Sequence, residues 1–148
     1  MKAVAAASIL ILSLAGCVSQ QELARRQSEI NELQSRLSAA RQNTSVTCPN
    51  KQACDKAFSL AKVYVQENAD MKLQFSDDTS VSTYNPIDYA YVALGATKTP
   101  EAGDSSSIRL VASCKGMDDG GYFFSLCANR IVPIYNGFKP YIESRIKP

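Results

Sequence analysis

Residues 108–131 have the sequence IRLVASCKGMDDGGYFFSLCANRI, and they say more about the fold than any other part of the chain. Two apolar stretches, Ile108–Lys115 and Tyr122–Ile131, flank the polar residues 118–121. Paired glycines between such stretches are typical of a tight turn joining two antiparallel strands. The segment therefore predicts a β-hairpin.

The register of this hairpin predicts a disulfide. If Gly120 and Gly121 are the central turn residues, Cys114 lies directly opposite Cys127 at a non-hydrogen-bonded position, where α-carbons are about 4.5 Å apart. Disulfides need α-carbons about 4.4 to 6.8 Å apart. A turn centred on Asp119 and Gly120 would make the cysteines diagonal neighbours at about 7 to 8 Å, which is too far. The Gly-Gly turn and a Cys114–Cys127 bond therefore support each other.

Two further cysteines, Cys48 and Cys54, would close a small loop at the start of a helix. A crossed pairing with Cys114 and Cys127, tying that helix to the hairpin, is the alternative. Zinc sites use closely spaced cysteine pairs, commonly with histidine, whereas the spacings here are C-x5-C and C-x12-C and the chain has no histidine. A redox-active pair would need C-x-x-C. We therefore predict two structural disulfides, with no metal and no cofactor.

Around the hairpin, the remaining patterns predict a small α+β domain over residues 44–148, here called the head. Apolar residues at helical spacing predict a helix from 49 to 68. Alternating apolar and polar residues predict strands, and segments rich in residues typical of loops separate these strands. A short closing helix is expected after Pro133. The expected strands are 71–75, 80–84 and 89–97, the expected loop is 99–107, and the closing helix covers 138–146. We expect an antiparallel sheet with helices on one face.

Residues 18–43, VSQQELARRQSEINELQSRLSAARQN, predict a helical stalk that resembles a coiled coil. Leu23, Ile30 and Leu37 recur every seven residues, and Leu33 and Ala40 take the intervening positions, with Arg26 as a defect. Such a helix is marginal alone in water, which favours self-association through the stalk. A solvated, monomeric tether is the alternative. Residues 43–47 are interpreted as a hinge between stalk and head.

The first 17 residues carry the clearest motif. An apolar run from Ala3 to Leu14 follows Lys2 and ends in Leu14-Ala15-Gly16-Cys17. This run is too short to span a membrane and is typical of a secretory signal. The motif resembles the lipobox of bacterial lipoproteins. The resemblance implies cleavage after residue 16, a lipid-modified (palmitoylated) Cys17, and residues 17–43 as lipidated N-terminus and stalk.

The resemblance also implies a location. Val18 and Ser19 lack the aspartate that commonly retains lipoproteins in the inner membrane, so the outer membrane is favoured, with the head in the periplasm. The membrane is then reached through the lipid on Cys17. After cleavage, 15 basic residues face 14 acidic ones, which gives no electrostatic footprint for nucleic acid.

No pattern predicts catalytic residues. Without histidine there is no Ser-His-Asp or Cys-His arrangement. The carboxylate pairs Asp77-Asp78 and Asp118-Asp119 lie in expected turns, where aspartate is favoured for backbone reasons. A cell-wall enzyme would need Asp77 or Asp78 to converge with Glu67, Asp88 or Glu101 across a cleft.

The tyrosines supply the candidate contact surface. Tyr84, Tyr89 and Tyr91 lie close together in the sequence, and tyrosine is enriched at protein interfaces. We therefore expect a non-enzymatic envelope lipoprotein, an accessory or scaffolding subunit that binds another envelope protein. An inhibitor or immunity lipoprotein that blocks an incoming enzyme is the alternative, favoured if the loop 99–107 is ordered and protruding. A cell-wall enzyme using paired carboxylates is the third possibility.

Overall fold

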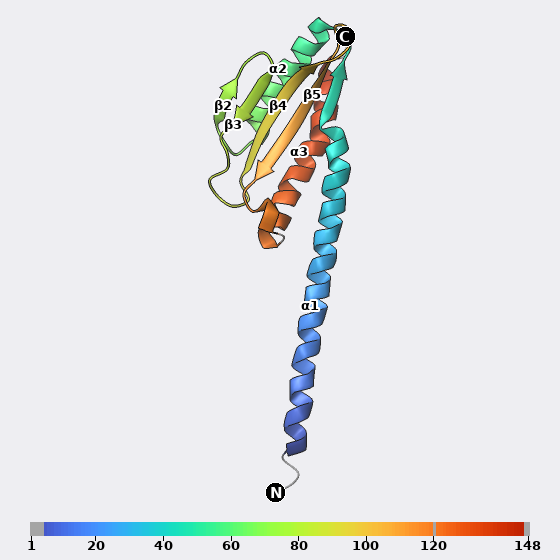
Figure 1. Ribbon diagram of the computed structural model, residues 1–148, viewed down its shortest axis with the longest axis vertical. Coiled ribbons are helices and arrows are strands. Elements are labelled where there is room, and N and C mark those ends of the chain that lie inside the picture. The colour runs from blue at the N-terminus through green and yellow to red at the C-terminus, as the bar shows by residue number, and fades with distance from the viewer. Residues whose placement is uncertain (1–4, 120, 147–148) are drawn as a thin grey trace.

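The computed structural model describes residues 5–119 and 121–146, with side chains described from Gln20 onward except that of Asp119. A single five-stranded antiparallel sheet is packed against helices, and a long N-terminal helix extends away from it (Figure 1). The α+β class, the antiparallel sheet and both disulfides are confirmed. The elements, in chain order, are α1 (Ala5–Ala40), the 3-10 helix η1 (Arg41–Asn43), β1 (Ser45–Cys48), α2 (Lys51–Asn68), β2 (Leu73–Ser76), β3 (Ser80–Thr83), β4 (Val92–Pro100), β5 (Ser106–Cys114), the 3-10 helix η2 (Met117–Asp119) and α3 (Tyr122–Ile146).

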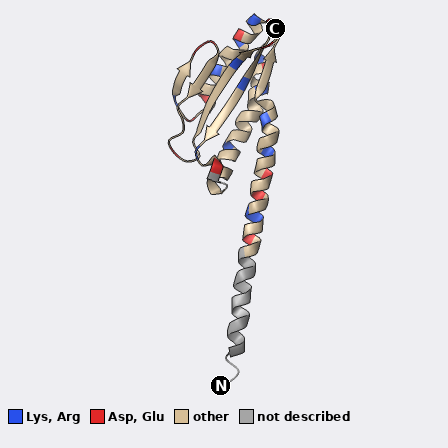
Figure 2. Ribbon diagram, in the orientation of Figure 1, with Lys and Arg blue, Asp and Glu red and all other residues tan. Residues whose placement is uncertain are grey.

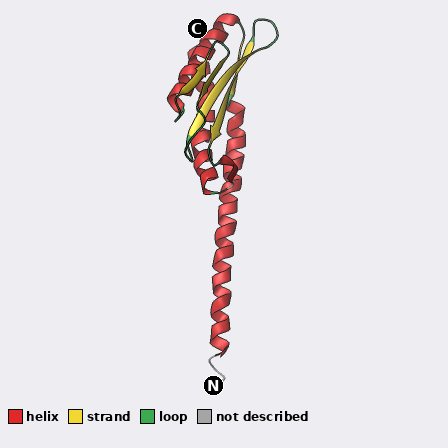
Figure 3. Cartoon of the chain, turned by 60° about the vertical axis from the view of Figure 1, so that its left-hand side comes forward, coloured by secondary structure: helices red, strands yellow, loops and turns green. Residues whose placement is uncertain are grey.

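The strand order is β1-β5-β4-β3-β2, and one face of the sheet is covered. Along β5, Ile108 and Leu110 are buried, whereas Arg109 and Val111 are exposed. This alternation is expected for a sheet with one face on the core and one face in solvent. Figure 3 shows the helices on one side of the sheet and none on the other.

Helix α2 forms where the sequence predicts it. The side chain of Asn50 accepts a hydrogen bond from the backbone N–H of Ala53 at 2.9 Å, which caps the first turn. Its buried stripe includes Ala57, Ala61 and Val65, at the expected four-residue spacing. This stripe packs against the covered face of the sheet and against α3.

The predicted second strand of the hairpin, Tyr122–Ile131, is wrong: these residues begin the 25-residue helix α3. Strand β5 instead pairs with β4 over nine residues, from Val92↔Cys114 to Pro100↔Ser106. Pro133, expected to end a strand, lies inside α3, as does Pro140. Both prolines are exposed, so the carbonyl groups that lose an N–H partner lie on the solvent side of the helix.

The two disulfides connect the residues that the sequence favours. Cys48 bonds to Cys54, with α-carbons 5.1 Å apart, and Cys114 bonds to Cys127, with α-carbons 5.8 Å apart. The second bond does not join facing strands. It joins the end of β5 to the second turn of α3, because the loop between them brings the helix back across the sheet. The pairing is confirmed, while the hairpin register from which it was predicted is not.

The expected hinge at residues 43–47 is also wrong, because this segment contains the edge strand β1. β1 pairs with β5 from Ser45↔Arg109 to Cys48↔Ser106, and the side chains of Val46 and Cys48 are buried. The preceding helix α1 packs against α3: Leu33 lies in a buried cluster with Phe124 and Ala128. The last turns of α1 are therefore part of the head's core.

The predicted lipidation site, Cys17, lies in α1 outside the residues whose side chains are described. Within the part of the chain that the structure covers, no helix combines the length and apolarity needed to cross a bilayer.

Candidate protein-binding surface

The tyrosines that the sequence singles out lie in and beside the loop between β3 and β4, since β4 begins only at Val92. Tyr84 and Tyr91 are brought together and are 52% and 42% exposed, and between them Ile87 is 70% exposed. These side chains border an open groove of about 530 Å³, here called the Tyr84 groove. It is lined by Asp70, Met71, Lys72, Gln74, Tyr84, Asn85, Ile87 and Tyr91.

Tyr89 does not face the Tyr84 groove. Its ring stacks on Phe123 of α3 at 4.2 Å between centroids, and the ammonium group of Lys115 lies 5.0 Å from the ring centre. Gly116, at φ +96°, passes so close that a Cβ there would lie 2.9 Å from Tyr89 Cδ1. Of the three predicted tyrosines, two form the groove and the third fixes the loop to the head.

Arg130 and Asp70 hold the other end of the loop. Arg130 pairs with the carboxylate of Asp70 at 2.5 Å and donates a hydrogen bond to the carbonyl of Ala90 at 3.3 Å. The same carboxylate accepts the backbone N–H of Val92 at 2.7 Å. Ala90 has φ 63°, the left-handed region that residues other than glycine rarely adopt. Such a conformation persists only where the surroundings enforce it, and these contacts do so.

Lys115 adds a third restraint. Its ammonium group donates a hydrogen bond to the carbonyl of Ile87 at 2.6 Å, and its own carbonyl accepts the N–H of Ala90 at 3.0 Å. The exposed side chain of Ile87 is thus presented on a backbone that is tied to β5 and α3. A rigid, exposed apolar group loses little conformational entropy on binding, which favours recognition.

Strand β2 forms the edge of the sheet next to the Tyr84 groove, and all four of its residues are exposed. Phe75 is 51% exposed and Leu73 is 39% exposed. The pairing with β3 shifts between Leu73 and Phe75, which places a β-bulge at Gln74. Bulges interrupt the regular row of backbone groups and discourage the addition of another strand. Recognition at this edge therefore falls to side chains.

Neither Ile87 nor Arg130 was predicted from the sequence. Ile87 is a lone apolar residue after Asn85-Pro86, and an apolar side chain in a polar loop is a signal that could have found it. Arg130 carries no local signal, because its role depends on the helical conformation of a segment predicted as a strand.

The carboxylates are placed in turns and ion pairs. Asp77 Oδ1 accepts the N–H groups of Thr79 and Ser80, both at 2.7 Å, and these bonds hold the pKa of Asp77 below its usual value. The turn interpretation of Asp77 is confirmed. Asp78 lines a small pocket with Asp55 and three lysines, and Glu67, Asp88 and Glu101 do not line it. Hydrogen bonds from Lys51 and Lys98 likewise lower the pKa of Asp55.

Among the residues that the structure describes, no three cysteine, aspartate or glutamate side chains lie close enough together to hold a metal ion.

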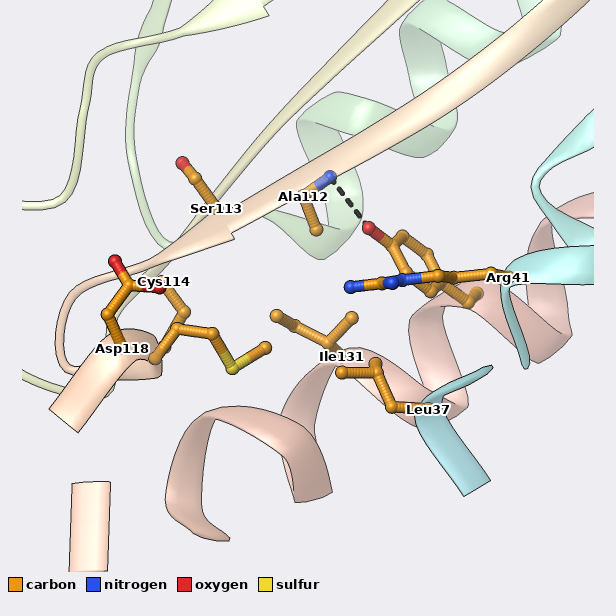
Figure 4. A pocket seen from close by; sticks show the side chains of 9 residues that line it. Leu37, Arg41, Ala112, Ser113, Cys114, Asp118 and Ile131 are labelled. Atoms are coloured by element: carbon orange, nitrogen blue, oxygen red, sulfur yellow. Dashed lines mark hydrogen bonds between the residues drawn. The ribbon is translucent and has the colours of Figure 1, made fainter. Parts of the chain in front are cut away.

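A separate cavity of about 230 Å³ lies between the end of α1, β5 and α3 (Figure 4). There the hydroxyl of Tyr135 accepts the N–H of Ala112 at 3.1 Å, and Arg41 extends across the opening. Tyr135 therefore provides a hydrogen-bond partner for a backbone N–H of β5 beyond the residues that pair with β1.

Comparison with known proteins assigns no family to the chain. No protein-family model matches the chain, and a search of curated proteins found no match.

Proposed function

We propose that this protein is a lipid-anchored accessory subunit that binds another envelope protein through the Tyr84 groove. The observation that carries the proposal is the group of exposed side chains Tyr84, Ile87 and Tyr91, presented by a loop that is fixed at both ends. Tyrosine is enriched among the residues that dominate protein–protein binding energy. Single exposed apolar residues need no explanation, but a rigid cluster of them does.

The lipobox at residues 14–17 supports the anchor, and Val18-Ser19 supports the outer membrane with the head in the periplasm. Self-association through the stalk has little apolar surface available, because much of the seam has a partner within the chain. Leu33, Leu37 and Ala40 are buried in the head, while Leu23 is 65% exposed and Ile30 is partly exposed. A coiled coil would have to use the short remainder.

Site-specific photocrosslinking in cells tests the proposed binding surface. A crosslinking amino acid at Ile87 is expected to capture one partner of defined mass. The same amino acid at Val111, which is 53% exposed on the open face of the sheet, serves as the matched control and is expected to capture none. In a strain with the crosslinker at Tyr84, Ile87→Asp should reduce capture by about tenfold, because a charge enters an apolar contact.

Capture at Val111 as strong as at Ile87, or capture of only further copies of the chain, would contradict the proposal. A third crosslinker position at Ala102 addresses the inhibitor alternative. The turn between β4 and β5 is closed by the bond from Glu101 N–H to the carbonyl of Ser105 at 3.0 Å and by the Ser105 hydroxyl to the carbonyl of Ala102 at 2.7 Å. This closed turn supports an inhibitor that inserts the hairpin tip, which predicts capture of an enzyme at Ala102 and none at Ile87.

A further inference from the structure

One end of the head lies beside α1, on the side toward the chain's N-terminus (Figure 1). There the first turns of α3 and the segment of α1 from Glu22 to Ile30 enclose a groove of about 470 Å³, with Tyr122 and Leu126 on the α3 side. Because α3 runs away from this point, the groove marks the part of the head nearest to residue 17.

The chain length limits how far this groove can lie from the proposed anchor. Five residues lead from Cys17 to Glu22, and a fully extended chain covers at most about 3.5 Å per residue, so the two α-carbons are at most about 17 Å apart. With helical geometry the separation is about 8 Å. A lipid on Cys17 therefore holds the groove close to the bilayer surface, whatever the conformation of the connecting residues.

The side chains at this end suit such a surface. Tyr122 is 74% exposed, the most exposed of the aromatic side chains that the structure describes. Leu23, which follows Glu22 in the segment of α1 beside the groove, is 65% exposed. Tyrosine has an apolar ring and a polar hydroxyl, and it is enriched at the membrane–water interface for that reason. Both signs of charge lie on the neighbouring turns of α1 (Figure 2). Glu22 and Glu29 balance Arg25 and Arg26, and both arginines pair with Glu22.

We infer that this end of the head, with the exposed Tyr122 of α3 and the exposed Leu23 of the adjacent α1 segment, rests on the bilayer to which the chain is anchored. The inference depends on the proposed lipidation of Cys17. A contact by two side chains is weak by itself, but an anchor five residues away raises the effective concentration of the surface and makes a weak contact sufficient. Since the nearby charges balance, the contact does not require anionic lipids, and it occurs on zwitterionic membranes.

The contact would also orient the Tyr84 groove. Tyr89 stacks on Phe123, the residue next to Tyr122, so the loop that carries Ile87 is attached to the same end of the head. A partner that binds this loop would meet the head at its membrane-proximal end.

The chain has no tryptophan, which makes a direct test simple. Tyr122→Trp introduces a single fluorophore at this end of the head, and Glu143→Trp introduces one at an exposed site 21 residues further along α3, about 32 Å away at 1.5 Å per residue. Each full-length variant is purified from membranes, its lipidation is checked by mass spectrometry, and it is reconstituted into phosphatidylcholine vesicles with brominated acyl chains.

Bromine quenches only nearby tryptophan, so the emission of the Tyr122→Trp protein is expected to fall by about half or more, consistent with a side chain at the interface. The Glu143→Trp protein should lose almost none. Absence of quenching at position 122 in a lipidated protein would overturn the inference and leave the anchor intact. Equal quenching at both positions would also overturn it, because the head would then lie on its side. Absence of the lipid itself would instead remove the proposed anchoring.

Discussion

Tyr64 and Gly137 illustrate how a single small residue is selected by its neighbour. The hydroxyl of the buried Tyr64 donates a hydrogen bond to the carbonyl of Ile134 in α3 at 2.7 Å, and burial raises the pKa of this tyrosine to about 12. A Cβ on Gly137 would lie 2.6 Å from the same hydroxyl oxygen. Glycine is unfavourable inside a helix by about 1 kcal/mol relative to alanine. Glycine is found at position 137 because the Tyr64 hydroxyl occupies the space that the methyl group of an alanine would need.

Gly137→Ala is therefore expected to destabilise the protein by about 1 to 3 kcal/mol, since the overpacked methyl group displaces the hydroxyl and outweighs the gain in helix propensity. In a Tyr64→Phe background the same change should be neutral or stabilising by up to about 1 kcal/mol, because the nearest remaining ring atom lies at ordinary contact distance. Denaturant unfolding of the two single variants and the double variant measures this coupling. Equal effects of Gly137→Ala in both backgrounds would show that the hydroxyl does not exclude the methyl group.

Helix α3 shows what sequence patterns can and cannot reveal. Its buried residues Phe124, Ala128, Ile131, Tyr135, Phe138 and Ile142 follow helical spacing. Two prolines and the aromatic start of the helix obscured that spacing and favoured a strand. Helix α2 was predictable because the residues at its start, its apolar stripe and the residues at its end all indicate a helix over the same segment. The disulfide pairing was also predictable, since proximity in sequence restricts it even when the intervening structure is misjudged.

The candidate surface was predictable only in part, for a related reason. Clustered tyrosines indicated the surface, although Tyr89 and Tyr91 were expected in a strand. Tyr89 stays 49% exposed but lies outside the Tyr84 groove, because its ring stacks on Phe123 beside Gly116. The restraint from Arg130 comes from 40 residues further along the chain. Local sequence carries no information about contacts at that separation.

Because α3 supplies that restraint, Arg130→Met should loosen the loop without unfolding the head. The variant keeps the apolar stem but loses the ion pair with Asp70 and the bond to the Ala90 carbonyl. The backbone N–H of Ala90 is expected to exchange with solvent about tenfold faster, which corresponds to about 1.4 kcal/mol of lost local stability. Hydrogen exchange measured by NMR checks this, and α2 amides serve as the internal reference. Unchanged exchange at Ala90 would show that Lys115 alone fixes the loop.

The protein combines a helix that begins outside the head with a core that this helix helps to complete. Leu33, Leu37 and Ala40 of α1 are among the buried residues, whereas Leu23 of the same seven-residue series is exposed. The heptad pattern that predicts a coiled coil therefore contains a segment that packs on α3 of its own chain. The pattern shows which face is apolar, and only the fold shows which helix covers it.

Leu23, which is exposed, and Leu37, which is buried in the core, provide a matched comparison of the two parts of the heptad pattern. Leu37→Ala is expected to reduce the free energy of unfolding by about 2 to 4 kcal/mol, because it leaves a cavity in the core. Leu23→Ala should change it by less than about 0.5 kcal/mol. Thermal or urea unfolding at two protein concentrations measures both. A loss of stability for Leu23→Ala that depends on protein concentration would instead indicate self-association through α1.

The packing of α1 on α3 has a consequence in time. Leu33 finds its partners Phe124 and Ala128 about 90 residues later in the chain. During synthesis, and during any passage through a membrane in an extended form, α1 therefore exists before α3 does. Its apolar face lacks a packing partner until α3 is present. An enzyme that modifies the beginning of the chain would meet it before the head has closed.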